Sequence, residues 1–369
     1  MALGKVSVNN LNLSQGAVTQ VENYFIFIGP GPKSQGQVIA LNTDSDLDVM
    51  LGVPASALKT QVTAARLNGG DRWACLAIPL GADKTWQDAL TSALQHNYSF
   101  EAIVICAPVT AGDELEDMHE AAIGLQNTYG RRAFVMASSV GIEPNMTWSQ
   151  YTTAQKAITD GIAAPRVLCV PLLHGNDLGV LAGRLANAAV SIADSPMRVA
   201  TGAVMGLGDI PVDSEGVPLT SAVRFELDKS RFSVSQTYPD YEGVYWGDGN
   251  MLDTPGSDFL VIEYLRIVDK AARQVRPLLI RRVGDRSLNS SAASMASNKT
   301  YLMTPLRAMA KSTSFAGRVF PGEIETPSDD AIVLTWKSKT AVEAYISIRP
   351  LNCPKDLTAN IALDLSTTE

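Results

Sequence analysis

Apolar residues in the first 200 positions occur in short runs that alternate with amphipathic stretches. The runs predict buried strands at 24–28, 37–41, 73–79, 101–106, 132–138 and 166–172. Between them, apolar residues spaced three and four apart predict helices at 46–52, 55–67, 84–95, 113–129, 147–159 and 177–193. Short buried strands that alternate with helices are typical of a mostly parallel sheet with helices on both faces. We therefore predict an α/β domain over residues 21–200.

The pattern changes after about residue 200. Residues 202–220 are rich in Gly, Pro and Asp, which predicts a loop or crossover. Two long helices are expected at 257–283 and about 299–313, with a linker rich in Ser, Ala and Asn at 287–298 between them. Shorter apolar runs predict strands near 231–237, 243–247, 331–336, 341–349 and 358–365. We predict an α+β second domain over residues 201–350.

Both ends of the chain have the pattern of extended arms, at residues 1–20 and 351–369. Apolar side chains alternate with polar ones at Val6, Val8, Leu11, Leu13, Ile361, Leu363 and Leu365. A strand with unpaired backbone groups is a liability for a monomer, but it can complete the sheet of a neighbouring subunit. We therefore expect these seven residues to form contacts between subunits.

Composition narrows the class of protein. Hydrophobic residues make up 46% and charged residues 18% of the 369 positions, which argues against a largely disordered chain. The net charge of −8 disfavours an overall nucleic-acid footprint. No secretory signal or membrane-spanning apolar stretch is expected. The four cysteines are scattered without CxxC spacing, so we predict neither a zinc site nor a disulfide framework.

The search for catalytic motifs yields one candidate. The Gly-rich segment 29–36 carries two prolines, which remove the N–H donors that a phosphate needs, so it predicts a turn. His119-Glu120 lacks the second His of a zinc motif. His174 and Asp177 follow a predicted strand and could lie at the carboxyl edge of the sheet, where α/β enzymes place their sites. We predict no catalytic, cofactor or metal residue, and keep an α/β enzyme near His174 as the alternative.

The predicted helix at 257–283 has a basic face opposite its apolar one. Arg266, Lys270, Arg273 and Arg281 lie on that face. Residues 266–286 contain seven basic and two acidic residues, a local net charge of +5. A solvated face, an acidic protein partner and nucleic acid are three interpretations, and the absence of interleaved aromatic residues disfavours the last.

The order of motifs along the chain resembles the tail sheath proteins of contractile bacteriophage tails and related injection systems. The N-terminal segment YFIFIGPGPKSQGQVIALNTDSDLDVMLG is similar to the family's opening strand, Gly-Pro turn and helix ending in Leu-Gly. GAVTQVEN before it looks like the family's N-terminal arm. GVYWGDGNML, the long helix with Arg266 and Asp269, and the ending YISIRPLNCPKDLTANIALDL follow in the family's order. The resemblance is thin over about residues 60–230.

The resemblance implies a structural subunit and no enzyme. Such subunits form stacked hexameric rings, a helical polymer around a tail tube, and contract by rigid-body rearrangement. It implies the tube, baseplate and tail terminator proteins as partners, no cofactor, and a place in the virion after assembly in the host cytoplasm. The basic face would then point toward the tube. A lattice-forming shell protein is a third class that also predicts polymers.

Overall fold

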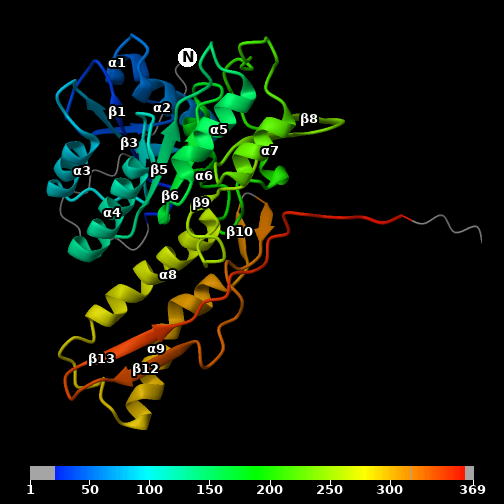
Figure 1. Cartoon of the computed structure of the whole chain (residues 1–369). Coiled ribbons are helices and arrows are strands. Elements are labelled where there is room, and N and C mark those ends of the chain that lie inside the picture. The colour runs from blue at the N-terminus through cyan, green and yellow to red at the C-terminus, as the bar shows by residue number, and fades with distance from the viewer. Residues whose placement is uncertain (1–20, 316, 362–369) are drawn as a thin grey trace, which may run out of the picture.

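The computed structural model describes residues 21–315 and 317–361, which form an α/β domain and a narrower second domain below it (Figure 1). A seven-stranded sheet with the order β2-β3-β1-β4-β5-β6-β9 forms the centre of the first domain. Its five inner strands are parallel: β3 (Ala74–Leu80), β1 (Phe25–Pro30), β4 (Ala102–Ile105), β5 (Phe134–Ser139) and β6 (Ala164–Pro171). The edge strands are antiparallel to their neighbours: β2 (Ile39–Asn42) and β9 (Met251–Leu252).

Helices cover both faces of this sheet, which confirms the predicted α/β class. One face packs against α3 (Trp86–Gln95), α4 (Gly112–Tyr129), α5 (Trp148–Thr159) and α7 (Ser221–Lys229). The other packs against α1 (Leu47–Leu51), α2 (Ala57–Asn68) and α6 (Asp177–Leu185). In β1, Ile26 and Ile28 enter the first core and Phe25 and Phe27 the second, because successive side chains of a strand point to opposite faces.

Residues 186–260 complete the first domain. They contain the 3₁₀ helix Val199–Thr201, the hairpin of β7 (Ser235–Tyr238) and β8 (Tyr241–Trp246), and helix α7, which the sequence pattern did not predict. Leu227 of α7 is fully buried in the core of the first domain. The sheet therefore continues past the boundary expected at residue 200, since β9 is its edge strand.

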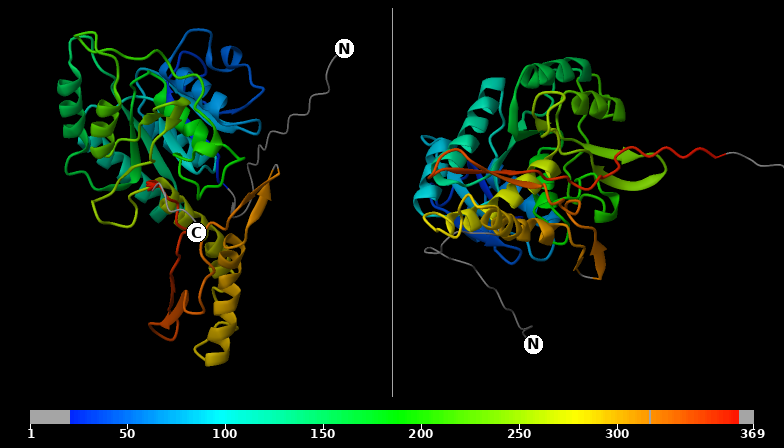
Figure 2. Two further views of the ribbon diagram at one scale, coloured as in Figure 1. Left: turned by 90° about the vertical axis from the view of Figure 1, so that its right-hand side faces the viewer. Right: turned by 90° about the horizontal axis from the view of Figure 1, so that it is seen from below.

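The second domain is built on two long helices, as expected. They are α8 (Ile262–Ile280) and α9 (Ala292–Met309), and they pack with the hairpin of β12 (Ile332–Trp336) and β13 (Val342–Ile346). Figure 2 shows these elements as a slender body beneath the sheet. A small hairpin follows α9, formed by β10 (Thr313–Phe315) and β11 (Arg318–Phe320).

One sequence expectation for this domain was wrong. Helix α9 begins inside the segment predicted as a linker, because Ser291 caps the amide of Ser294 and an Ala-rich turn follows. Residues 358–361, the described part of the strand expected at 358–365, form no strand within the chain, and the expected pairing with a neighbouring subunit stays a prediction. Pro277 lies inside α8, in its last turn, and does not end the helix there.

Helix α8 links the two domains. Its first turns place Ile262 and Leu265 in the core of the α/β domain. Further along, Ile267, Ala271 and Val275 belong to the core of the second domain. One rigid helix therefore belongs to both cores, and its polar face lies between them.

Candidate functional site: the polar face of helix α8

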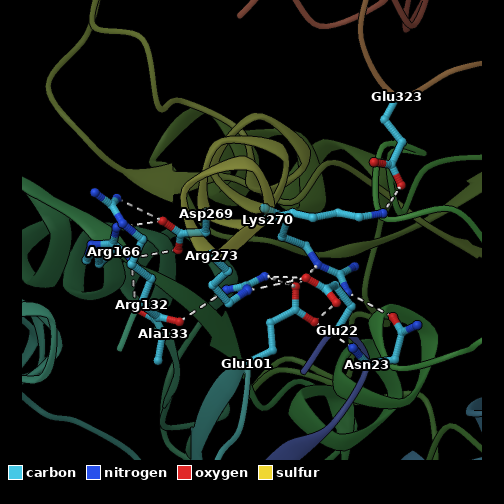
Figure 3. Close-up of polar contacts among 11 residues, drawn as sticks. Glu22, Asn23, Glu101, Arg132, Ala133, Arg166, Asp269, Lys270, Arg273 and Glu323 are labelled. Carbon is cyan, nitrogen blue, oxygen red and sulfur yellow. Dashed lines mark hydrogen bonds and ion pairs between the residues drawn. The ribbon is translucent and has the colours of Figure 1, made fainter. Parts of the chain in front are cut away.

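The polar face of α8 lies against the amino-terminal edge of the parallel sheet (Figure 3). Its partners stand at the starts of neighbouring strands: Asn23 before β1, Glu101 before β4, Arg132 before β5 and Arg166 near the start of β6. Because parallel strands all begin at one edge, charged residues at their starts converge there. The sequence carried this signal, which our search for motifs missed.

Arg266 and Glu101 form the central ion pair. The Arg266 Nε and Nη2 atoms each donate to a different Glu101 oxygen at 2.8 Å. The two side chains are only 3% and 1% exposed. Asn23 completes the group, since its Oδ1 accepts from Arg266 at 2.9 Å and its N–H donates to Glu101 at 2.7 Å. The chain just before β1 is therefore bound to α8.

Asp269, one turn further along α8, is held by two arginines of the sheet edge. Arg166 donates to both carboxylate oxygens at 2.8 Å, and Arg132 donates to one at 3.2 Å. Arg166 also donates to the carbonyl of Ala133 at 2.9 Å. A planar guanidinium that meets a carboxylate at two points fixes distance and orientation together.

Two further pairs extend the network in both directions. Arg273 donates to Glu22 at 2.9 Å and to the carbonyl of Arg132 at 3.2 Å. Lys270 pairs with Glu323 of the second domain at 2.5 Å. Helix α8 thus joins the N-terminal end of the described chain, the sheet edge and the second domain through side chains at four of its positions.

These contacts correct the expectation of an open basic face. Arg266 and Arg273 are buried and paired within the chain, and Lys270 is paired and partly buried. Burial of an unpaired guanidinium is costly, so each recruits an acidic partner from the sheet side. Arg281 alone of the four is exposed, at the C-terminal cap of α8.

The network specifies how the domains meet more than it adds net stability. Desolvation offsets much of the attraction in a buried ion pair, but loss of one partner leaves a charge stranded and costs about 3–5 kcal/mol. The two-point pairs Arg266–Glu101 and Arg166–Asp269 are satisfied in one orientation of α8 against the sheet. The network therefore favours that orientation of the two domains.

The expected arm residues are placed only in part. Val6, Val8, Leu11, Leu13, Leu363 and Leu365 lie outside the described residues. Ile361 is 96% exposed at the end of an extended segment that runs away from the body (Figure 1). The contact expected between Ile361 and another subunit stays a prediction.

His174 and Asp177 do come together, at the carboxyl edge of the sheet. The His174 Nδ1 atom lies 2.7 Å from Asp177 Oδ1, and the His174 N–H donates to Oδ2 at 2.6 Å. Both side chains are nearly inaccessible, at 3% and 2% exposure. The carboxylate thus secures the turn into α6, a structural role for the pair.

A hollow lies at the same carboxyl edge but elsewhere. It has a volume of about 750 Å³ and lies at the ends of β1 and β3 beside Trp86, and Lys84 is the one ionisable residue of its lining. Among the described residues, no group of three or more His, Cys, Asp or Glu side chains could hold a metal ion. No helix of that part of the chain combines the length and apolarity needed to cross a bilayer.

The chain is similar in fold to solved structures of sheath proteins. The contracted sheath complex of an extracellular contractile injection system (PVC) matches 99% of this chain and 98% of its own, with a TM-score of 0.60 and 13% identity. The contracted helical sheath of the anti-feeding prophage matches 98% and 99%, with a TM-score of 0.61 and 14% identity. The sheath tail protein Lin1278 of Listeria innocua matches 91% and 94%, with a TM-score of 0.56 and 11% identity. The fold is that of a contractile sheath subunit.

Sequence comparison identifies the family. Residues 3–250 match the DUF2586 N-terminal domain and residues 258–366 the DUF2586 C-terminal domain. A protein assigned by name to the tail sheath of Haemophilus phage HP1 (strain HP1c1) is 43% identical over 371 residues, 98% of each chain. The chain belongs to the DUF2586 family of tail sheath proteins, a structural component of contractile phage tails. The resemblance predicted from sequence is confirmed, and the enzyme alternative has no support among these relatives.

Proposed function

We propose that this subunit polymerises into stacked hexameric rings around an inner tail tube, held together by its two terminal arms. The observation that carries the proposal is the β12–β13 sheet. It has two strands in the described residues, so both of its outer edges offer backbone donors and acceptors. A two-stranded hairpin is marginal in water, and added strands stabilise it.

The arms supply suitable strands. Within the two arms, apolar side chains recur at every second position, as a strand added to a half-buried sheet requires, at Val6 and Val8, at Leu11 and Leu13, and at Ile361, Leu363 and Leu365. One side of the hairpin is already packed, with Ile332 and Leu334 buried against α9. Arms donated by two neighbours would continue that apolar layer. Main-chain pairing then links subunits that can still rotate relative to one another.

Contraction in this proposal is a rearrangement of rigid subunits. The α8 network holds both domains in one orientation. The movement of subunits relative to one another is therefore taken up by the terminal arms and not by the junction between the domains. The energy comes from surface buried between subunits, and no nucleotide is consumed. The protein acts as a structural element and not as an enzyme, reaching the virion from the host cytoplasm where it is made.

Charge is divided unevenly between the domains. Residues 21–260 contain 14 basic and 27 acidic residues, a net charge of −13, whereas residues 261–361 contain 15 basic and 9 acidic, a net charge of +6. Exposed cations gather at the end of the second domain farthest from the sheet, on the α8–α9 loop and the β12–β13 turn (Figure 1). They are Arg281, Arg286, Lys337 and Lys339. We propose that this basic end faces an acidic tube surface, and that baseplate and terminator proteins bind the ends of the polymer.

Electron microscopy of the full chain beside a chain lacking 351–369 tests the proposal. We expect hollow sleeves from the full chain and dispersed subunits from the truncated one, with equal helix content by circular dichroism. Small discrete particles from both would overturn the sheath proposal. Sheets or closed shells would indicate a different lattice, and sleeves from both chains would overturn the role of the C-terminal arm.

A further inference from the structure

Lys355 anchors the C-terminal segment to the body of the protein. Its ammonium lies 2.6 and 2.7 Å from the two oxygens of Asp248 and 2.7 Å from Glu263 Oε1. Asp248 belongs to the turn before β9, and Glu263 to the first turn of α8. One lysine from near the end of the chain therefore neutralises two carboxylates of the domain junction.

The carboxylates around Lys355 are stabilised by a cation beside them. Glu263 is 1% exposed, and its carboxylate accepts no hydrogen bond of good geometry in the described structure apart from its ion pair with Lys355. Burial, and then the nearby Asp248, raise the pKa of Glu263 above its ordinary value. Burial works to lower the pKa of Lys355, but Glu263 and Asp248 raise it overall. Asp228, which is half-buried, adds a third carboxylate to the surroundings.

Little else holds this segment. Residues 351–361 form no helix or strand, and most of their side chains are exposed. The Leu351 N–H donates to the carbonyl of Glu323 at 3.4 Å, and after Lys355 every described residue is exposed. Lys355 is thus the point at which the C-terminal arm leaves the folded body.

The chain that directly follows the N-terminal arm is bound to the same helix. Glu22 and Asn23 pair with Arg273 and Arg266. Glu263 and Arg273 are ten residues apart on α8, about 15 Å at the rise of an α-helix. The roots of both arms are therefore fastened to one short stretch of a single rigid helix.

We propose that Asp248 and Glu263 form a lysine-binding site that fixes the start of the C-terminal arm to α8. Helix α8 then forms the mechanical connection between the two arms. The role of the arms rests on the proposed sheath function, but the site itself does not. In a polymer, a pull on either arm would pass to the other through α8 and the sheet edge that is bound to it.

Cys353 provides a natural probe, two residues before Lys355. It is partly exposed, whereas Cys75, Cys106 and Cys169 are completely buried. The rate at which a small disulfide reagent labels the unassembled full-length chain therefore reports release of the segment, and the number of thiols labelled reports the fold. We expect Lys355→Met to raise the rate about tenfold or more, with one thiol labelled per chain, since hydrogen bonds to charged groups contribute at least this factor.

Matched variants complete the experiment. Lys355→Arg, which keeps the charge, and Lys339→Met, a change at an exposed lysine of the β12–β13 turn, should label at close to the wild-type rate. If Lys355→Met unfolds and four thiols react, the double variant Glu263→Gln/Lys355→Met removes the lysine together with its more deeply buried carboxylate and should show fast labelling of one thiol. A wild-type rate in a folded variant that lacks Lys355 would overturn the proposal. Because assembly is not measured, absence of sleeves would leave this result unchanged.

Discussion

Arg266 and Glu101 are 165 residues apart in the sequence, yet they meet through two hydrogen bonds of 2.8 Å in a buried ion pair. One residue belongs to the helix that enters the second domain, and the other precedes the central strand β4. The pair therefore sets the position of α8 on the sheet edge, and with it the position of the second domain.

Removal of one partner should be strongly destabilising. Arg266→Met leaves Glu101 charged and buried beside Asn23, and we expect a loss of about 3–5 kcal/mol in the free energy of unfolding, measured by urea denaturation. The double variant Arg266→Met/Glu101→Met strands no charge and should lose clearly less than the single one. Arg307→Met, at an exposed site on α9, should change stability by no more than about 0.5 kcal/mol. A single variant as stable as the control would show that the pair does not fix the domain junction.

Much of the fold follows from local pattern. Phe25, Phe27 and their neighbours form a continuous apolar run because β1 is covered on both faces, and such runs are easy to recognise. The sequence pattern did not predict α7 because only one of its residues, Leu227, is buried. A helix with one buried residue has almost no periodic spacing of apolar positions. The hydrophobic pattern is thus most informative where helices cover the sheet most fully.

The functional face was harder to predict. The basic stripe of α8 looked solvent-exposed because the acidic partners of Arg266 and Arg273 lie 165 and 251 residues away. Helical periodicity assigns residues to faces, but it cannot tell whether water or a distant carboxylate covers a face. Only the meeting of several parallel strands at one edge would have indicated it.

A glycine on α6 should be essential for the contact between α2 and α6. A Cβ atom at Gly183 would lie 2.2 Å from the carbonyl oxygen of Ala65, so the helices would have to separate. We expect Gly183→Ala to destabilise the protein by about 1–3 kcal/mol, despite the better helix propensity of Ala. Gly124→Ala on α4 is the matched control, because no atom lies within 4 Å of its added Cβ. That change should stabilise by about 0.5–1 kcal/mol, and equal melting temperatures for the two variants would contradict this account.

Glu263 should give the stability a measurable pH dependence. Its pKa is raised in the folded state from an ordinary value of 4.5, so the folded chain binds a proton that the unfolded chain has released. The contribution of this proton to the free energy of unfolding is fully present below about pH 4.5. It is lost as the pH rises through the pKa of Glu263 in the folded state.

The comparison with Glu263→Gln isolates this contribution. Asp248, Asp228 and Lys355 remain in the variant, so the difference in unfolding free energy between the two proteins reports Glu263. We expect wild type to lose stability relative to the variant as the pH rises from 4 to 7. A difference that is constant over this range would show that Glu263 has the same pKa in both states, and one that grows in favour of wild type would show that folding lowers its pKa.

The exposed basic end of the second domain should control assembly around the tube. Arg281→Glu/Arg286→Glu reverses two charges that lie in solvent, so the fold and the melting temperature should hardly change. If the tube surface is acidic, the variant should sediment with purified tubes much less than wild type at low salt. The amounts of the two proteins that sediment with tubes should become equal at about 0.5 M salt, where charges are screened within a few ångströms.

Arg307→Glu/Lys311→Glu, an equal reversal at exposed sites near the other end of α9, is the control and should co-sediment like wild type. Equal, salt-independent co-sedimentation of both reversed variants would show that the tube is not held by this end. If both reversed variants lost co-sedimentation to the same degree, overall charge rather than a defined surface would control binding to the tube.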